Sequence, residues 1–277
     1  MRALMAITTA NQIAYNREAF RSTLTGKPGY VDMLVVDDAS DDGTVELARG
    51  LGLTVITKSR PRGHIDSLNK AYEVFVTKAY DVLILANNDI LVPRGALENL
   101  CTALERNTVV SPMSTATGVG HQPAQALRHH FPTIPIDETQ PGHYQRVQDY
   151  LTGLALERGS VRELPYVNSF VIGMSRRARE FELPGGQIFD PRNVNVGNED
   201  EFCARVTDKK YVCITSFVFH FKGVTLELSN FDGTSFDLNV NRQLTWKRAE
   251  AIGRSPLKRL LYKVVRRLSS VLPTNLR

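Results

Sequence analysis

Three side chains that carry ligand oxygens follow an apolar stretch of the sequence. Val82–Ala86 has the composition of a buried strand, and Asn87, Asn88 and Asp89 come directly after it. Open α/β sheets bind their ligands at the carboxyl ends of the strands, and carboxylate and amide oxygens suit Mg²⁺ or Mn²⁺. The segment therefore indicates a divalent-cation site, although Asn and Asp are also common in ordinary turns and helix caps.

Two adjacent acids end a second apolar stretch. Asp37 and Asp38 follow Met33–Val36, and turn residues come after them. Neighbouring carboxylates are costly to place together unless a partner uses them, and the N–H of a nucleotide base or the hydroxyls of a ribose are suitable partners. The alternative interpretation is a turn in which Asp42 or Thr44 caps the following helix.

The spacing of apolar segments indicates which elements position these acids. Strand-like and helix-like segments alternate through the first hundred residues. The predicted strands are Leu4–Thr8, Met33–Val36, Leu53–Thr57 and Val82–Ala86. The predicted helices are Asn16–Leu24, Thr44–Arg49, Ile65–Lys78 and Arg94–Glu105, with Pro93 at the start of the last one, where its missing N–H costs nothing. Near-continuous apolar strands in βα repeats predict a parallel sheet covered on both faces.

The remainder of the sequence is less regular. Residues 111–164 are rich in proline and have little periodicity, which is typical of a functional or mobile segment. We then predict a strand at Tyr166–Met174, a helical start at Ser175–Phe181 and an aromatic strand at Tyr211–Phe221. A basic amphipathic helix is predicted at about 255–271. Such a helix suits an anionic membrane surface, and packing against the domain or a partner subunit is an equal alternative.

The composition is that of a folded globular protein. Of the 277 residues, 42% are hydrophobic and 23% are charged, which excludes an intrinsically disordered chain. The net charge of +5 favours phosphate-bearing ligands or an anionic membrane, but dispersal of the basic residues among acids disfavours DNA binding. The widely spaced Cys101, Cys203 and Cys213 indicate a reducing compartment. No stretch reaches transmembrane length, and we expect a cytoplasmic protein.

Five motifs occur in order along residues 1–225. They are VVDDASDDGT at 35–44, Arg62-Gly63 through Asn69-Lys70-Ala71, Asn87-Asn88-Asp89, Phe189-Asp190 leading to Asn198-Glu199-Asp200-Glu201-Phe202-Cys203-Ala204-Arg205, and Phe219-His220-Phe221-Lys222-Gly223. In this order and spacing they resemble those of family 2 glycosyltransferases, whose DXD motif varies here to Asn-Asn-Asp. The Pro-x-Gly-x-Leu pattern at 93–97 resembles the subgroup of rhamnosyl- and galactofuranosyltransferases.

The resemblance implies a fold and an activity. The fold is the GT-A type, a Rossmann-like and mostly parallel sheet flanked by helices over residues 1–225, with a C-terminal helical extension at 226–277. The activity is an inverting transfer of a hexosyl or deoxyhexosyl group from a nucleotide-diphosphate sugar to a hydroxyl of a glycan or lipid-linked acceptor, as in polysaccharide biosynthesis. Through its basic tail, the protein would be peripheral on the cytoplasmic face of a membrane.

The resemblance also implies a site. Asp89 and His220 would hold Mn²⁺ or Mg²⁺, which stabilises the negative charge that grows on the leaving diphosphate. From the residues alone, His220 can equally be a packed histidine among aromatic neighbours. The implied donor-binding residues are Thr8, Thr9, Asp37, Asp38, Arg62, Asn69, Asn87 and Asn88. The implied acceptor-side residues are Asn168 and Ser169.

A carboxylate must take the proton of the acceptor hydroxyl as it attacks the anomeric carbon. The candidates are Glu199 and Asp200. The Glu-Asp pair itself resembles a motif in which the second acid is the base, and we predict Asp200. If the motif is aligned instead on Glu201 through Arg205, the equivalent position is Glu199. The acids could also simply stabilise the first turn of a helix through its dipole.

Two other classes of function compete with this one. A sugar-phosphate nucleotidyltransferase would need a glycine-rich phosphate loop near the N-terminus, and Met1–Arg17 contains no glycine. A non-catalytic nucleotide-sugar-binding module is disfavoured because the candidate metal ligands and candidate bases occur together. Dinucleotide-dependent oxidoreductases and P-loop enzymes are disfavoured because their glycine motifs are missing.

Overall fold

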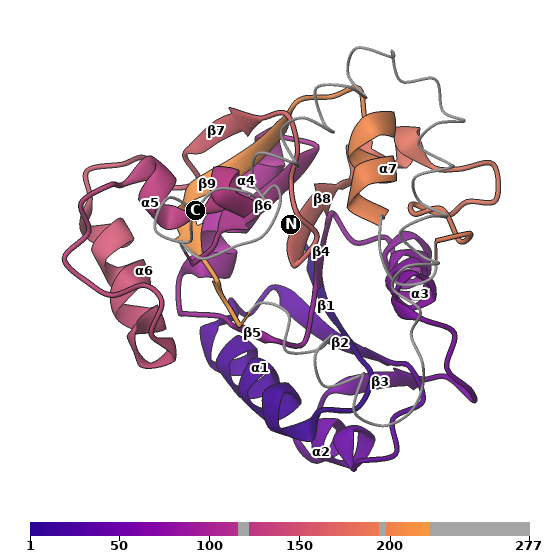
Figure 1. The fold of residues 1–277 in the computed structure, drawn as a ribbon. Coiled ribbons are helices and arrows are strands. Elements are labelled where there is room, and N and C mark those ends of the chain that lie inside the picture. Colours follow the sequence, from indigo (N-terminus) through magenta and orange to yellow (C-terminus); the bar gives the residue numbers. More distant parts are fainter. Residues whose placement is uncertain (116–121, 194–197, 222–277) are drawn as a thin grey trace, which may run out of the picture. The chain divides into compact units, whose positions relative to one another are not determined.

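The computed structural model describes residues 1–115, 122–193 and 198–221 (Figure 1). The strands are β1 (Ala3–Thr9), β2 (Val31–Asp37), β3 (Thr54–Thr57), β4 (Val82–Ala86), β5 (Ile90–Leu91), β6 (Val109–Met113), β7 (Val161–Leu164), β8 (Val171–Ser175), β9 (Lys210–Phe217) and β10 (Phe219–His220). The α-helices are α1 (Ile13–Gly26), α2 (Thr44–Gly50), α3 (His64–Thr77), α4 (Ala96–Arg106), α5 (Leu127–His130), α6 (Tyr144–Gly153) and α7 (Asn198–Arg205). Short 3₁₀ helices are η1 (Gln122–Gln125), η2 (Pro141–His143) and η3 (Arg176–Phe181).

The main sheet has eight strands in the order β3-β2-β1-β4-β8-β6-β9-β7. Its first four strands are parallel, and their register places Thr9 opposite Asp37 and Ile7 opposite Ala86. The carboxyl ends of β1, β2 and β4 therefore lie at one edge, where both acidic motifs follow. The predicted α/β fold, a mostly parallel sheet flanked by helices, is confirmed.

The sheet is covered on both faces, as the near-continuous apolar strands predict. Leu4 and Ala6 pack in one buried cluster with side chains of α3, whereas Met5 and Ile7 pack in another with side chains of α1 and α4. This alternation follows from the period of two residues along a strand. Both faces of β1 thus lie in hydrophobic cores, which fix the strand ends that carry the candidate site.

The second half of the sheet is mixed, and here several predicted elements differ. The strand predicted at Tyr166–Met174 begins only at Val171, and it runs antiparallel to β4 and β6. The helical start at Ser175–Phe181 is the 3₁₀ helix η3. The strand predicted at Tyr211–Phe221 divides into β9, which pairs with β6 and β7, and β10, which pairs with β5.

Regular structure also occurs where little was expected. The segment 111–164 contains the end of β6, helix α6 and strand β7, and short elements of this kind produce a weak periodic signal. Helix α4 begins at Ala96 rather than Arg94, because Gly95 has φ +88°, a left-handed conformation that interrupts the helix. Pro93 is not a first-turn residue, and its carbonyl accepts a hydrogen bond from Ala96 N instead.

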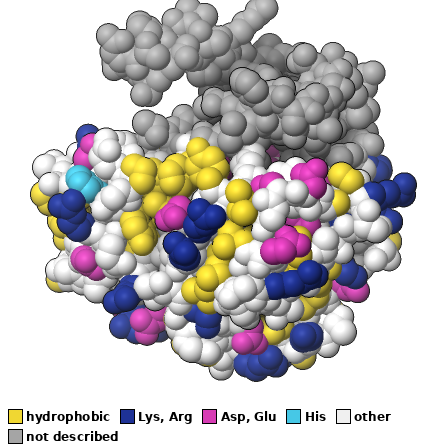
Figure 2. Space-filling model, turned by 90° about the horizontal axis from the view of Figure 1, so that it is seen from below, with side chains coloured by type: hydrophobic (Ala, Val, Ile, Leu, Met, Phe, Trp, Pro, Cys, Tyr) yellow, Lys and Arg dark blue, Asp and Glu magenta, His cyan; other side chains and the backbone are white. Residues whose placement is uncertain are grey.

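Charged side chains of both signs are interspersed with hydrophobic ones on the face that Figure 2 shows. None of the helices in the described part of the chain is long and apolar enough to cross a membrane. The predicted extension at 226–277, its amphipathic helix and Lys222 lie outside the described residues.

Candidate functional site

Asp89 and His220, far apart in sequence, are neighbours at the carboxyl edge of the sheet. His220 Nε2 lies 3.3 Å from Asp89 Oδ1, and the two side chains are only 6% and 2% exposed. Strand β5 follows Asp89 and pairs with β10, so that His220 lies opposite Ile90. Phe221 N also donates to Asp89 O at 3.0 Å. Backbone pairing thus determines the contact between the two side chains.

These two residues fit a divalent cation. Within the described part of the chain, Asp89 Oδ1, His220 Nδ1 and Asn87 Oδ1 are buried without a hydrogen-bond partner. A carboxylate oxygen and an imidazole nitrogen form a donor set that Mn²⁺ accepts. No cluster of three His, Cys, Asp or Glu side chains suitable for a metal occurs among the residues described, so the remaining ligands would be water or substrate oxygens.

Asp38 organises the loop that precedes α3. Its carboxylate accepts hydrogen bonds from the backbone of Arg62 at 2.7 Å and Gly63 at 2.8 Å. Lys58 Nζ lies 2.8 Å from the same carboxylate and 2.9 Å from that of Asp66. Partners within the protein therefore stabilise the Asp38 carboxylate beside that of Asp37. Through them, Asp38 connects the end of β2 to the start of α3.

Several predicted donor-binding side chains are bonded within the protein. Asp37 is fully buried and accepts from Ser40 N at 3.0 Å and Ser40 Oγ at 2.5 Å. Thr9 Oγ1 donates to Asn16 Oδ1 at 2.8 Å, and Asn88 Nδ2 donates to the same oxygen at 2.9 Å. Asn16, a fully buried residue of α1, thus joins the ends of β1 and β4.

His64 is a further residue of this edge that the sequence did not indicate. Its Nδ1 lies 3.2 Å from Thr8 Oγ1, and the Thr8 hydroxyl is positioned to donate to Ala86 O at 3.3 Å. The tautomer of His64 sets which of the two atoms, Nδ1 or Thr8 Oγ1, donates. Burial, with a smaller effect of Lys58, lowers the pKa of His64 to about 4. The imidazole is therefore neutral near pH 7, and Thr8 is held between two elements.

The acids at the start of α7 have different environments. Burial raises the pKa of Glu199, and a hydrogen bond with Ser169 lowers it by a smaller amount. Glu201 forms an ion pair with Arg205 at 2.6 Å, and Arg205 also donates to Ile188 O at 2.6 Å. Glu201 is thus a structural partner of Arg205, whereas Glu199 lies against the predicted acceptor-side segment.

Residues 168–170 connect these groups. Phe170 stacks on His220 with ring centroids 4.9 Å apart and an interplanar angle of 14°, and Phe170 O accepts from Asn87 N at 2.9 Å. Asn168 N donates to the buried Gln125 Oε1 at 2.6 Å, and Gln125 Nε2 donates to Ser111 Oγ at 2.6 Å. Ser169 contacts Glu199 as described above. Gln125 lies in the proline-rich segment, and its role has no sequence signature.

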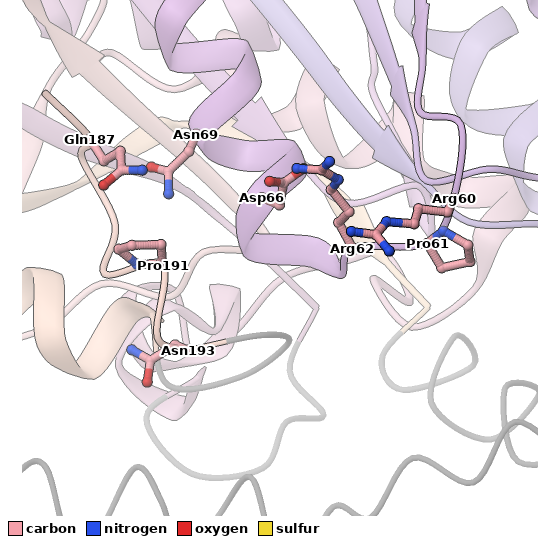
Figure 3. Close-up of a pocket in the computed structure, with 8 residues that line it drawn as sticks. All are labelled: Arg60, Pro61, Arg62, Asp66, Asn69, Gln187, Pro191 and Asn193. Carbon is pink, nitrogen blue, oxygen red and sulfur yellow. The ribbon is translucent and has the colours of Figure 1, made fainter. Parts of the chain in front are cut away.

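Beside α3 lies a polar cavity of about 360 Å³. Figure 3 shows Arg60, Arg62 and Asp66 on one side of it and Asn69, Gln187 and Asn193 on the other. The side chain of Asn69 is bonded within the protein, because it donates to Phe189 O at 2.9 Å and accepts from Phe189 N at 3.0 Å. Thus the structure groups Asp89 with His220 and Ser169 with Glu199, while Asn69 and Arg62 line a separate cavity.

Comparisons with solved structures identify the fold. The chain is similar to GalNAc-T7 in complex with UDP, GalNAc and Mn²⁺, with a TM-score of 0.57 and 14% identity over 79% of this chain and 44% of that one. The mannosyltransferase PcManGT from Pyrobaculum calidifontis, in complex with GDP-Man and Mn²⁺, matches with a TM-score of 0.53 and 15% identity over 95% of this chain and 79% of that one. At such identities the likeness shows the fold, which is GT-A, and the chain spans less than half of the GalNAc-T7 structure.

The glucosyl-3-phosphoglycerate synthase from Mycobacterium tuberculosis, in complex with Mn²⁺, UDP-glucose and phosphoglyceric acid, matches with a TM-score of 0.50 and 17% identity over 82% of this chain and 74% of that one. A search of curated proteins finds no significant match to the sequence. The family model described as glycosyl transferase family 2 matches residues 5–162, more than half of the chain. The chain therefore belongs to glycosyl transferase family 2.

Proposed function

We propose that this protein transfers a sugar from a nucleotide-diphosphate sugar to an acceptor hydroxyl with the assistance of a divalent metal ion. The observation that carries the proposal is the Asp89–His220 pair, which is buried at the carboxyl edge of the sheet. Asp89 Oδ1 and His220 Nδ1 have no hydrogen-bond partner within the described ranges, and the chain belongs to glycosyl transferase family 2. The structural relatives named above were solved with UDP or GDP-mannose and Mn²⁺, which supports a donor of this class.

Asp89 and His220 would hold the cation. A bound Mn²⁺ or Mg²⁺ stabilises the charge that develops on the departing diphosphate. The contribution of the chain is to keep both ligands in place before binding. His220 is held by the β10–β5 pair and by the ring of Phe170, and the Asp89 backbone is held by Phe221. Such preorganisation avoids reordering during the reaction.

The contacts of Glu199 and Glu201 support Glu199 as the general base, in place of the predicted Asp200. The Glu201–Arg205 ion pair agrees with the motif alignment that is anchored on those two residues. Burial raises the pKa of Glu199, and a carboxylate with a raised pKa is a stronger proton acceptor. Its contact with Ser169 places Glu199 beside the proposed acceptor-side residues Asn168 and Ser169. With the proton taken from the far side of the sugar, transfer would invert the anomeric configuration.

The proposed donor site follows the ends of β1, β2 and β4. Thr8 and Asp38 are held by His64 and by the loop before α3, so the donor would meet side chains that are already ordered. Thr9, Asp37 and Asn88 would act mainly by shaping this edge, because their side chains are bonded to Asn16 or Ser40. The proposed acceptor is a hydroxyl of a glycan or a lipid-linked sugar, and the transferred group is a hexose or deoxyhexose, as in the rhamnosyl- and galactofuranosyltransferases.

The first experiment measures thermal stabilisation of the full chain by UDP-, GDP- and dTDP-sugars with and without Mn²⁺. A ligand at 100 times its Kd stabilises the folded state by about 2.7 kcal/mol. We expect one nucleotide class to stabilise the protein only with Mn²⁺, and we expect Asp89→Ala to abolish this gain. Stabilisation that persists in Asp89→Ala, or no stabilisation by any donor, would contradict the proposed site.

The second experiment tests the general base with the donor found in that panel. Glu199→Ala should lose about 10²–10⁴-fold in the transfer rate while it still binds the donor with Mn²⁺. Asp200→Ala is the matched control because it removes the neighbouring carboxylate from the same helix turn. If Asp200→Ala loses transfer and Glu199→Ala retains it, the base is Asp200.

A further inference from the structure

The cavity beside α3 has a polar and cationic lining. Two of its lining side chains are the guanidinium groups of Arg60 and Arg62, and both residues are exposed to solvent. Across the cavity lie the side chains of Gln187 and Asn193 (Figure 3). Guanidinium groups and side-chain amides are hydrogen-bond donors that together recognise carboxylate and phosphate oxygens.

The acids next to the cavity are already paired. Asp38 and Asp66 share Lys58, with distances of 2.8 and 2.9 Å, and Asp38 also accepts two backbone hydrogen bonds. In contrast, neither guanidinium group has an ion-pair partner among the residues the structure describes. The lining and its direct partners therefore have a net positive charge, which attracts an anion.

The wall opposite the arginines is held firmly. Asn69 forms two hydrogen bonds with the Phe189 backbone, and Arg205 donates to Ile188 O at 2.6 Å while it is paired with Glu201. The segment 187–193 is thus attached to α3 on one side and to α7 on the other. An anion in this cavity would lie beside the segment that is anchored to the helix carrying Glu199.

We propose that this cavity is a binding subsite for a phosphate or carboxylate group of the acceptor, in place of the donor-binding role implied above for Arg62 and Asn69, with the guanidinium groups of Arg60 and Arg62 as its recognition groups. That the anion belongs to the acceptor rests on the proposed transfer reaction, whereas the anion subsite itself does not. The ligands that the sequence motifs assign to the metal, Asp89 and His220, are not among the residues that line the cavity. The other source of the same chemistry is the donor diphosphate, and the experiment separates the two.

The test uses the full chain and inorganic phosphate as the probe, measured by titration calorimetry in buffer with EDTA. Loss of a charge-assisted hydrogen bond of about 1.5–3 kcal/mol corresponds to at least a tenfold change in affinity. We expect Arg60→Ala to lower the affinity for phosphate about tenfold. We expect Arg60→Lys to bind phosphate with an affinity between those of Arg60→Ala and the wild type. Arg146→Ala, which removes an exposed arginine of α6, is the charge-matched control and should bind phosphate as the wild type does.

The affinity for nucleoside diphosphate and Mn²⁺ is measured in the same variants. An acceptor subsite predicts that this affinity is unchanged in Arg60→Ala. A parallel loss of phosphate and nucleotide binding would assign the arginines to the donor and overturn the acceptor assignment. Equal phosphate binding by wild type and Arg60→Ala, or none by the wild type, would overturn the anion subsite. Failure of the proposed transfer reaction would appear separately, as phosphate binding without any nucleotide binding.

Discussion

The buried side chain of Gln125 offers a sharp test of how the site is supported. Gln125 is fully buried; it accepts a hydrogen bond from Asn168 N and donates one to Ser111 Oγ, each at 2.6 Å. Gln125→Met keeps a similar volume but removes these two short hydrogen bonds and a longer one from Gln125 Nε2 to Pro112 O at 3.5 Å. We expect the variant to be less stable and to lose the position of residues 168–170, which contact His220 and Glu199.

The magnitude follows from the two bonds. A buried N–H left without an acceptor costs about 1–3 kcal/mol, and a second lost hydrogen bond costs about 1 kcal/mol. The free energy of unfolding should therefore fall by about 2–4 kcal/mol. Since 1 kcal/mol shifts the Tm of a domain of this size by roughly 2–4 °C, the Tm should fall by roughly 4–16 °C.

Gln148 provides a matched control for the same substitution. It is also fully buried, it accepts from Phe217 N at 2.9 Å, and it donates to Thr215 O at 2.8 Å. Gln148→Met should lose similar stability. The hydrogen bonds from Val218 to Met113 and from Phe221 to Asp89 would still hold the strand that carries His220.

The two variants are compared by thermal unfolding, by their affinity for nucleoside diphosphate and Mn²⁺, and by transfer rate below their Tm. We expect Gln125→Met to lose about 10²-fold in transfer rate through misplaced groups, and we expect Gln148→Met to stay close to wild type. If both variants lose the same stability and the same activity, the proposed positioning role of Gln125 is wrong.

Two further predictions concern stability. Because burial raises the folded-state pKa of Glu199, the wild type loses stability as the pH rises from the ordinary value of 4.5 through that pKa. The Tm of Glu199→Gln should therefore exceed that of the wild type across this pH range and should not exceed it at lower pH. A Tm difference between the two proteins that does not depend on pH would contradict the burial argument. A Cβ at Gly26 would lie 2.8 Å from Val92 O and 3.0 Å from Pro93 O, so Gly26→Ala should destabilise by about 1–3 kcal/mol in urea unfolding. A Cβ at Gly50 in α2 would meet nothing within 4 Å, so Gly50→Ala should stabilise by about 0.5–1 kcal/mol. The opposite order of stability would refute the close approach of Gly26 to the Val92 and Pro93 backbone.

The N-terminal half of the fold could be predicted because its signals are local. Continuous apolar strands such as Val82–Ala86 are buried wherever they lie, and the βα alternation restricts them to a parallel sheet. The predicted strands match β1 to β4 within a few residues. The later strands were harder to place, because β8 is antiparallel and the segment before it is bonded to Gln125 rather than to a neighbouring strand. Such a partner leaves no periodic pattern in the sequence.

The sequence by itself determined which chemical groups are available and that the ends of β1, β2 and β4 share an edge. Asp89 and the pair Glu199 and Asp200 could be selected because their residue types and motif spacing suit metal binding and proton transfer. The tertiary structure alone decided that His220 contacts Asp89, that Asn16 holds Thr9 and Asn88, and that burial raises the pKa of Glu199. These features depend on contacts between distant segments and on exclusion of water. Both arise only when the whole chain is packed.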